Sequence, residues 1–198
     1  IKTLKKKKFN CPIILICSKK QLIKQAKFLK KNIKFNELTK DFKNYKNYKF
    51  KKINLINVEY EQDKPFDKIS SKSNKYIEES FEIALKLIKY KISDKLINGP
   101  ISKENFLSNN FLGITEYLAF KTRTKNFAMI IYNKKLSVCP ITTHLPLKYV
   151  AKKLNKIEII NKVKLINLFW KKFFNKKLKI GITGLNPHCE SIDYFKED

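Results

Sequence analysis

Short apolar runs alternate with helix-periodic segments through the first half of the chain, and this alternation restricts the possible folds more than any other feature. Residues 12–17 (P-I-I-L-I-C) are a continuous apolar run, as in a strand covered on both faces. Residues 21–31 then place Leu22 and Ala26 at helical spacing. This strand–helix–strand rhythm predicts a parallel α/β sheet with right-handed crossovers. Further strands are expected at residues 33–35, 53–58 and 95–98, a helix at about 70–90, and loops at 41–52 and 59–68.

The second half of the chain departs from this rhythm. Residues 126–132 and 136–142 are both typical strand sequences, and only Asn133-Lys134-Lys135 separates them. Because so short a link permits only an antiparallel hairpin, a mixed sheet is expected. Helices are expected from Pro146 to about residue 154 and from about 156 to 174, and a short buried strand at residues 179–183.

The composition fits a globular protein with a real core. Apolar residues make up 43% of the 198 residues and include 15 Phe and 9 Tyr, which excludes a disordered chain. No apolar run reaches the roughly 18 residues of a membrane-spanning helix, so no membrane partner is expected. The basic start before residues 12–17 superficially suggests a signal peptide. The apolar part is too short and lacks a small-residue cleavage site, so a first core strand is the preferred interpretation.

The formal net charge of +27 is typical of nucleic-acid-binding proteins. However, Arg123 is the only arginine, and the lysines are spread along every predicted helix instead of forming one stripe. Base and phosphate recognition favours the arginine fork, so we expect no nucleic-acid partner. A basic nucleic-acid-binding module remains the alternative from another functional class. The positive charge would still attract a small anionic substrate.

The four cysteines show no C-x-x-C spacing and lie in or beside predicted strands; they are Cys11, Cys17, Cys139 and Cys189. We interpret them as buried, reduced thiols of a cytoplasmic protein. A reactive thiol at Cys189, which follows His188 directly, is the alternative.

The only two histidines each follow a predicted strand. His144 comes after the strand expected at residues 136–142, and His188 comes after the strand expected at 179–183. Ligands of open α/β sheets bind at the carboxyl ends of strands, so we expect the two imidazoles to face one crevice. Ordinary capping or loop hydrogen bonds are the alternative role of both side chains.

Four segments are notable for their order, spacing and position: I-N-G-P-I-S-K-E (97–104), G-I-T-E-Y-L-A (113–119), T-T-H-L-P-L (142–147) and T-G-L-N-P-H-C-E (183–190). Together they resemble the 4-hydroxythreonine-4-phosphate dehydrogenase family of the vitamin B6 pathway. The resemblance implies a three-layer α/β/α mixed sheet of the isocitrate/isopropylmalate-dehydrogenase type. It also implies a fragment that is incomplete at both ends, with residues 1–111 in a first lobe and 112–198 in a second, dimer-forming and metal-binding lobe.

The resemblance implies an oxidoreductase of pyridoxine biosynthesis. The family oxidises 4-phosphohydroxy-L-threonine with NAD or NADP to a 3-oxo acid. This acid loses CO2 to give 3-amino-2-oxopropyl phosphate on the route to pyridoxal 5'-phosphate. Three histidines bind a divalent metal ion (Zn, Mg or Co) at a site shared between the subunits of a homodimer. His144 and His188 match the first two metal ligands, and the third would lie beyond Asp198.

The resemblance also assigns Thr115 to substrate binding, whereas Ile114 stands where the family has a histidine. A helix cap is the alternative role of Thr115. Lys103 is expected either to neutralise the substrate's anion or to be a solvated side chain, and no catalytic residue is assigned. Ile114 leaves room for a sister dehydrogenase acting on threonate or erythronate 4-phosphate. The chain by itself is expected to be inactive because its site is incomplete.

Overall fold

The structure is a computed structural model that describes residues 1, 11–41, 53–107 and 110–186. The chain forms two compact units, Ile1–Asn110 and Phe111–Asp198, which we call unit 1 and unit 2 and describe separately. The lobe boundary expected from the resemblance falls after residue 111, and the units divide after residue 110. That the two units are the lobes of a larger enzyme stays a prediction.

A three-stranded parallel sheet lies at the centre of unit 1. It consists of β1 (Ile13–Cys17), β2 (Phe35–Leu38) and β3 (Ile53–Asn57) in the order β1-β3-β2. The register places Ile53 opposite both Ile13 and Phe35. The strands form here because their isoleucine and leucine side chains suit a pleated, buried surface. The predicted α/β class is therefore confirmed, whereas the three-layer mixed-sheet architecture stays a prediction.

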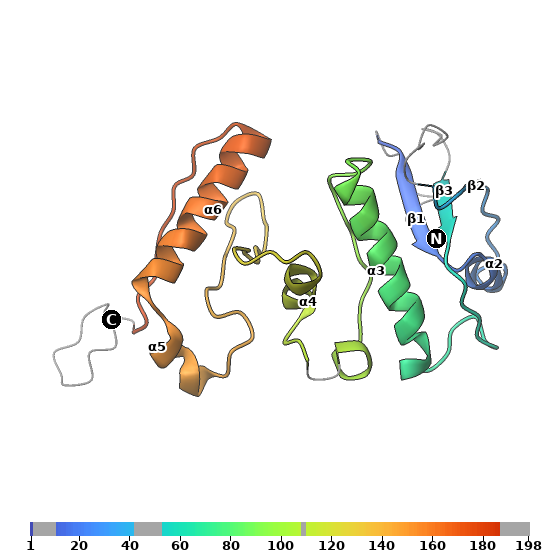
Figure 1. The fold of residues 1–198 in the computed structure, drawn as a ribbon, viewed down its shortest axis with the longest axis horizontal. Helices are drawn as coiled ribbons and strands as arrows, with labels where there is room; N and C mark the ends of the chain where they lie inside the picture. The colour runs from blue at the N-terminus through green and yellow to red at the C-terminus, as the bar shows by residue number, and fades with distance from the viewer. Residues whose placement is uncertain (2–10, 42–52, 108–109, 187–198) are drawn as a thin grey trace. The chain divides into compact units, whose positions relative to one another are not determined.

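Two helices accompany this sheet. α2 (Lys19–Phe28) follows β1 directly, because the side chain of Ser18 caps it by accepting a hydrogen bond of 3.2 Å from the backbone N–H of Gln21. α3 (Asn74–Lys89) follows the short 3₁₀ helix η1 (Ser71–Ser73) and runs along the side of the sheet away from α2 (Figure 1). Both helices were expected from their apolar spacing.

The core of unit 1 lies between the sheet and α3. Apolar residues from β2, β3, the residue after β3 and α3 pack together there: Leu38, Ile56, Val58, Ile83 and Leu87, all 7% exposed or less. The α3 residues come from one stripe at helical spacing, and Ile56 is fully buried in the central strand. This packing fixes the position of the carboxyl ends of the strands.

Shortening one side chain of this core should cost measurable stability. We expect Ile56→Val to lower the free energy of unfolding by about 1 kcal/mol, because the lost methyl group leaves a small cavity. Urea denaturation followed by circular dichroism measures the change. The matched control is Ile97→Val, at a side chain that is 95% exposed, where the change should stay below about 0.5 kcal/mol. Equal losses in both variants would contradict this assignment of the core.

Unit 2 contains α4 (Ile114–Lys121), α5 (Val150–Lys153) after the 3₁₀ helix η3 (Leu147–Tyr149), and α6 (Lys156–Phe174). The bounds of α6 agree with the prediction because local signals set them. Asn155 caps its start by accepting a hydrogen bond of 2.8 Å from the backbone N–H of Glu158, and Asn175 ends it in a left-handed conformation with φ 50°. None of the helices in the described ranges is both long and apolar enough to cross a bilayer.

Three predicted strand regions are not strands. Residues 95–98 and 179–183 have no regular structure, and the expected hairpin of 126–132 with 136–142 contains one antiparallel bridge, between Ile131 and Val138. A strand needs neighbouring N–H and C=O groups. Within the described residues these segments form no ladder of hydrogen bonds with a neighbouring strand. The side chains of Ile97 and Ile182 are accordingly 95% and 67% exposed. The expectations that His144 follows a strand at 136–142 and that His188 follows a strand at 179–183 are therefore wrong.

The prediction that the cysteines are buried is only partly right. Cys11 is exposed, whereas Cys17 and Cys139 are half-buried free thiols. Burial raises the pKa of the Cys17 thiol to about 11 and raises that of Cys139 above its usual value. Both thiols are therefore protonated at neutral pH. Cys189 lies outside the described residues, as do residues 42–52 of the predicted loop.

Candidate active site

The start of α4 presents the G-I-T-E segment. Gly113 caps the helix with an extended backbone (φ −165°, ψ 177°), and Ile114, Thr115 and Glu116 form its first turn. A carboxylate in the first turn interacts favourably with the positive end of the helix dipole. The backbone N–H groups of such a turn have no partner within the helix and favour anionic groups. Thr115, the predicted substrate-binding residue, is half-buried in this turn.

The turn at residues 142–145 brings His144 to the same place. The backbone N–H of Leu145 donates to the carbonyl of Thr142 at 2.9 Å, and Thr143 adopts a left-handed conformation with φ 42°. A Cβ atom added to Gly113 would lie 2.6 Å from Nε2 of His144 and 2.8 Å from its Cδ2. The imidazole therefore packs directly against Gly113, and only glycine leaves room for the ring there.

Glu116 is the third member of this arrangement and was not among the residues predicted from the sequence. Its Oε1 accepts a hydrogen bond of 3.1 Å from the hydroxyl of Thr143. Its Oε2 is buried and has no hydrogen-bond partner in the described part of the chain. The sequence contained a signal for Glu116, because it is a carboxylate within one of the motifs and in the first turn of a helix. A residue placed in this way is a candidate for the site that the motif forms. We call Gly113, Glu116, Thr143 and His144 the unit 2 cluster.

The other predicted site residues are not placed in this cluster. His188, the second predicted metal ligand, lies outside the described residues, so its convergence with His144 stays a prediction. Lys103 is exposed and begins the π-helical turn η2 (Lys103–Leu107) of unit 1. Ile114 is half-buried as the first residue of α4.

The unit 2 cluster fits a metal site in its chemistry but supplies only part of one. Within the described ranges there is no group of three histidine, cysteine or acidic residues that could hold a metal ion. What the cluster offers is an exposed imidazole and, beside it, a carboxylate oxygen that has no partner among the described residues. A carboxylate beside a histidine is the usual outer partner of a metal-bound imidazole. Nitrogen and oxygen donors of this kind suit Zn²⁺ or Co²⁺.

A second candidate region lies at the carboxyl end of β1 in unit 1, where ligands of α/β sheets bind. An open pocket of about 320 Å³ there is lined by Cys17, Gln21, Tyr60 and Tyr76 among others. Burial raises the pKa of Tyr76 above its usual value, as it does that of Cys17. The side chains that line this pocket include neither a metal-binding carboxylate nor an imidazole.

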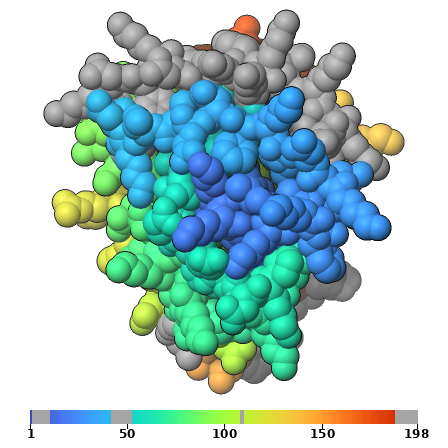
Figure 2. Space-filling model, turned by 90° about the vertical axis from the view of Figure 1, so that its right-hand side faces the viewer, coloured from blue at the N-terminus to red at the C-terminus, as the bar shows by residue number. Residues whose placement is uncertain are grey.

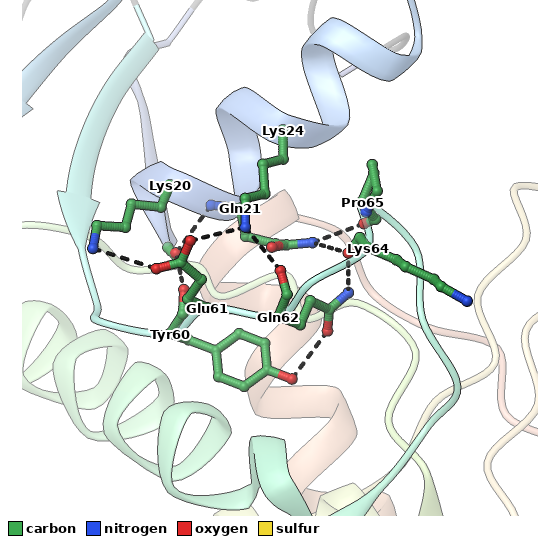
Figure 3. A network of polar contacts seen from close by, with 9 residues as sticks. Lys20, Gln21, Lys24, Tyr60, Glu61, Gln62, Lys64 and Pro65 are labelled. Carbon is green, nitrogen blue, oxygen red and sulfur yellow. Dashed lines mark hydrogen bonds and ion pairs between the residues drawn. The ribbon is translucent and has the colours of Figure 1, made fainter.

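Polar contacts fix the loop after β3 beside this pocket (Figure 3). Glu61 forms ion pairs with Lys24 at 2.8 Å and Lys20 at 3.4 Å, and these lysines lower its pKa by hydrogen bonding and then by charge. Gln21 donates to the carbonyl of Pro65 at 2.8 Å. The residues of α2 (blue) and this loop (teal) lie side by side on one face of unit 1 (Figure 2). Because Glu61 is exposed, the pairs position the loop more than they stabilise the fold.

Comparison with known families identifies the chain. Residues 9–194 match the family model described as pyridoxal phosphate biosynthetic protein PdxA. The chain belongs to the PdxA family. The resemblance that the four sequence segments suggest is thereby confirmed.

Individual PdxA relatives carry two different names. The chain is 38% identical over 185 residues to a 4-hydroxythreonine-4-phosphate dehydrogenase of Sulfurihydrogenibium sp. (strain YO3AOP1), a match that covers 92% of the chain and 56% of the relative. It is 28% identical over 105 residues to a D-threonate 4-phosphate dehydrogenase of Salmonella typhimurium, covering 52% of the chain and 32% of that relative. The chain thus spans about half the length of the first of these relatives and less of the second.

Solved structures of similar fold agree with the family. The chain superimposes on a 4-hydroxythreonine-4-phosphate dehydrogenase from Klebsiella pneumoniae with a TM-score of 0.73 at 22% identity. The match covers 91% of this chain and 56% of the Klebsiella chain. At this identity the comparison establishes a shared α/β fold, so activity must be argued from the site.

Proposed function

We propose that the complete protein is a cytoplasmic NAD- or NADP-dependent oxidoreductase that oxidises 4-phosphohydroxy-L-threonine. The 3-oxo acid would then decarboxylate to 3-amino-2-oxopropyl phosphate, on the route to pyridoxal 5'-phosphate. The observation that carries the proposal is the contact between two motif segments far apart in sequence. The ring of His144 packs against Gly113, the residue that begins G-I-T-E. Membership of the PdxA family supports the same reaction class.

The chain's own residues would bind and orient the substrate. His144 and His188 would hold a divalent cation, and the hydroxyl of Thr115 would donate a hydrogen bond to an anionic group of the substrate at the start of α4. When bound, the cation would polarise the substrate's alcohol oxygen while the nicotinamide accepts the hydride. The proposal further includes a third ligand of the metal and a homodimer with a shared site. It also includes the isocitrate/isopropylmalate-dehydrogenase-like three-layer architecture.

A sister activity on D-threonate 4-phosphate is the second candidate. Two observations favour it: the chain has Ile114 where the family has a substrate-contacting histidine, and a relative named D-threonate 4-phosphate dehydrogenase matches half of the chain. An isoleucine removes a hydrogen-bond donor from the substrate site. A binding site discriminates most strongly between similar substrates when the wrong one leaves a polar group of the site without a partner. The isoleucine at position 114 removes one such polar group.

Turnover by the protein expressed from its complete reading frame separates the two candidates. With Zn²⁺ or Co²⁺ present, we expect reduction of NAD or NADP with 4-phosphohydroxy-L-threonine to exceed that with D-threonate 4-phosphate in kcat/KM. Removal of the metal by a chelator should abolish both reactions, and re-addition should restore them. Turnover of the threonate alone would overturn the first candidate, and full turnover after chelation would overturn the role of the metal.

A further inference from the structure

Glu116 connects the first turn of α4 to the turn that carries His144. Its Oε1 accepts the 3.1 Å hydrogen bond from Thr143, the residue directly before His144. Thr143 has a φ of 42°, and a β-branched residue is rarely found in this left-handed region. A side-chain contact that holds Thr143 in this conformation also fixes the backbone from which the imidazole projects. Glu116 thus acts on the orientation of His144 through the chain.

The second oxygen of Glu116 lies beside the imidazole itself. A Cβ atom on Gly113 would lie 2.9 Å from Oε2 of Glu116 and 2.6 Å from Nε2 of His144. The two atoms are therefore at most 5.5 Å apart, the sum of these distances. Oε2 is buried and has no partner in the described residues, and a buried carboxylate oxygen requires a donor. The ring N–H of His144 is a donor that shares this space.

We infer that Glu116 is a positioning residue for His144: Oε1 holds the Thr143 turn, and Oε2 is the oxygen that would accept the Nε2–H of the imidazole after a small movement of either side chain. A neutral imidazole that donates from Nε2 carries its lone pair on Nδ1, so Nδ1 is the atom presented to a cation. Metal-ligating histidines usually donate their other ring N–H to a carboxylate or carbonyl in this way. The inference rests on the proposed function of His144 as a metal ligand.

The test compares Glu116→Gln with the unsubstituted protein, both expressed from the complete reading frame. This substitution keeps the size of the side chain and removes the charge. We expect the affinity for Co²⁺, measured by equilibrium dialysis, to fall about 10- to 100-fold. The matched control Glu158→Gln removes the same charge in the first turn of α6 and should leave the affinity unchanged. Glu116→Asp, which keeps a carboxylate, should recover part of the loss.

A second readout needs no metal. In the metal-free protein, long-range ¹H–¹⁵N NMR of the neutral imidazole reports which ring nitrogen is protonated. We expect His144 to be in the Nε2–H tautomer and to become a mixture of tautomers in Glu116→Gln. A role of Glu116 in folding alone would leave this ratio unchanged.

The outcomes distinguish this inference from the proposed function. If His144→Ala lowers Co²⁺ affinity while Glu116→Gln leaves both affinity and tautomer unchanged, the role of Glu116 is wrong and the proposed function stands. If His144→Ala itself leaves Co²⁺ affinity unchanged, the metal-binding function fails and the inference fails with it. A loss beyond about 100-fold in Glu116→Gln would make Glu116 a direct ligand and overturn the positioning role.

Discussion

Replacing His144 by alanine in the protein expressed from its complete reading frame is expected to lower both metal affinity and kcat/KM by more than about 100-fold. Loss of an outer partner of a ligand already costs roughly 10- to 100-fold, so loss of the ligand itself should cost more. The fold should survive, because His144 is exposed in a turn and such substitutions usually change the free energy of unfolding by less than about 0.5 kcal/mol. His188→Ala should have the same effect on metal affinity if both imidazoles hold one cation.

Leu147→Ala is the control for this experiment. Leu147 lies three residues after His144 and its side chain is 85% exposed, so its removal should leave metal affinity, turnover and stability unchanged. Atomic absorption after gel filtration measures the retained metal, and reduction of the nicotinamide measures turnover. Undiminished turnover and metal content in His144→Ala would refute the ligand role of this residue.

The second large effect is expected from Gly113→Ala, a change of one methyl group. The new Cβ would lie 2.6 Å from Nε2 of His144 and 2.9 Å from Oε2 of Glu116, closer than Cβ atoms approach other heavy atoms in folded proteins. Both side chains must therefore move. Since a displacement of about 1 Å at a catalytic site can cost 100-fold in rate, we expect kcat/KM to fall by about that factor. The backbone of Gly113 is extended, with φ −165°, so alanine adds no backbone strain.

In Gly113→Ala the activity should fall much more than the stability. The atoms that must yield are the ends of two side chains, so we expect the free energy of unfolding to change by no more than about 1 kcal/mol. Gly181→Ala is the matched control, because nothing lies within 4 Å of the Cβ position there, and it should resemble the unsubstituted protein in both measurements. Unchanged kcat/KM in Gly113→Ala would contradict the close packing of His144 on the start of α4.

The elements that could be predicted from the sequence are those whose signals are local or whose apolar side chains pack against the core. The run at residues 12–17 forms β1, and the Asn155 and Asn175 caps delimit α6. Residues 179–183 and 95–98 have similar strand composition and form no strand. Strand formation depends on a neighbouring strand, and alternation within one segment cannot show whether such a neighbour exists.

The motifs that form the site could be predicted from the sequence, but the contacts between them could not. The resemblance drew attention to Thr115 and His144, and the structure places both at or near the start of α4. Glu116 was missed, although it stands in G-I-T-E, because its role depends on a hydrogen bond to Thr143, 27 residues later. Sequence spacing does not show which turn folds back on which helix. That Ile114 stands where the family has a histidine is what the resemblance implies.

The order of the strands in unit 1 has a consequence for how the chain folds during synthesis. β1 and β2 each pair with β3 and are not neighbours in the sheet, although β3 is the last of the three in sequence. No ladder of this sheet can therefore form before residues 53–57 have left the ribosome. Until then the apolar run at residues 13–17 is without its partner strand. Such a nascent segment is a natural target for chaperones, and a pause in translation before residues 53–57 have left the ribosome would lengthen its exposure.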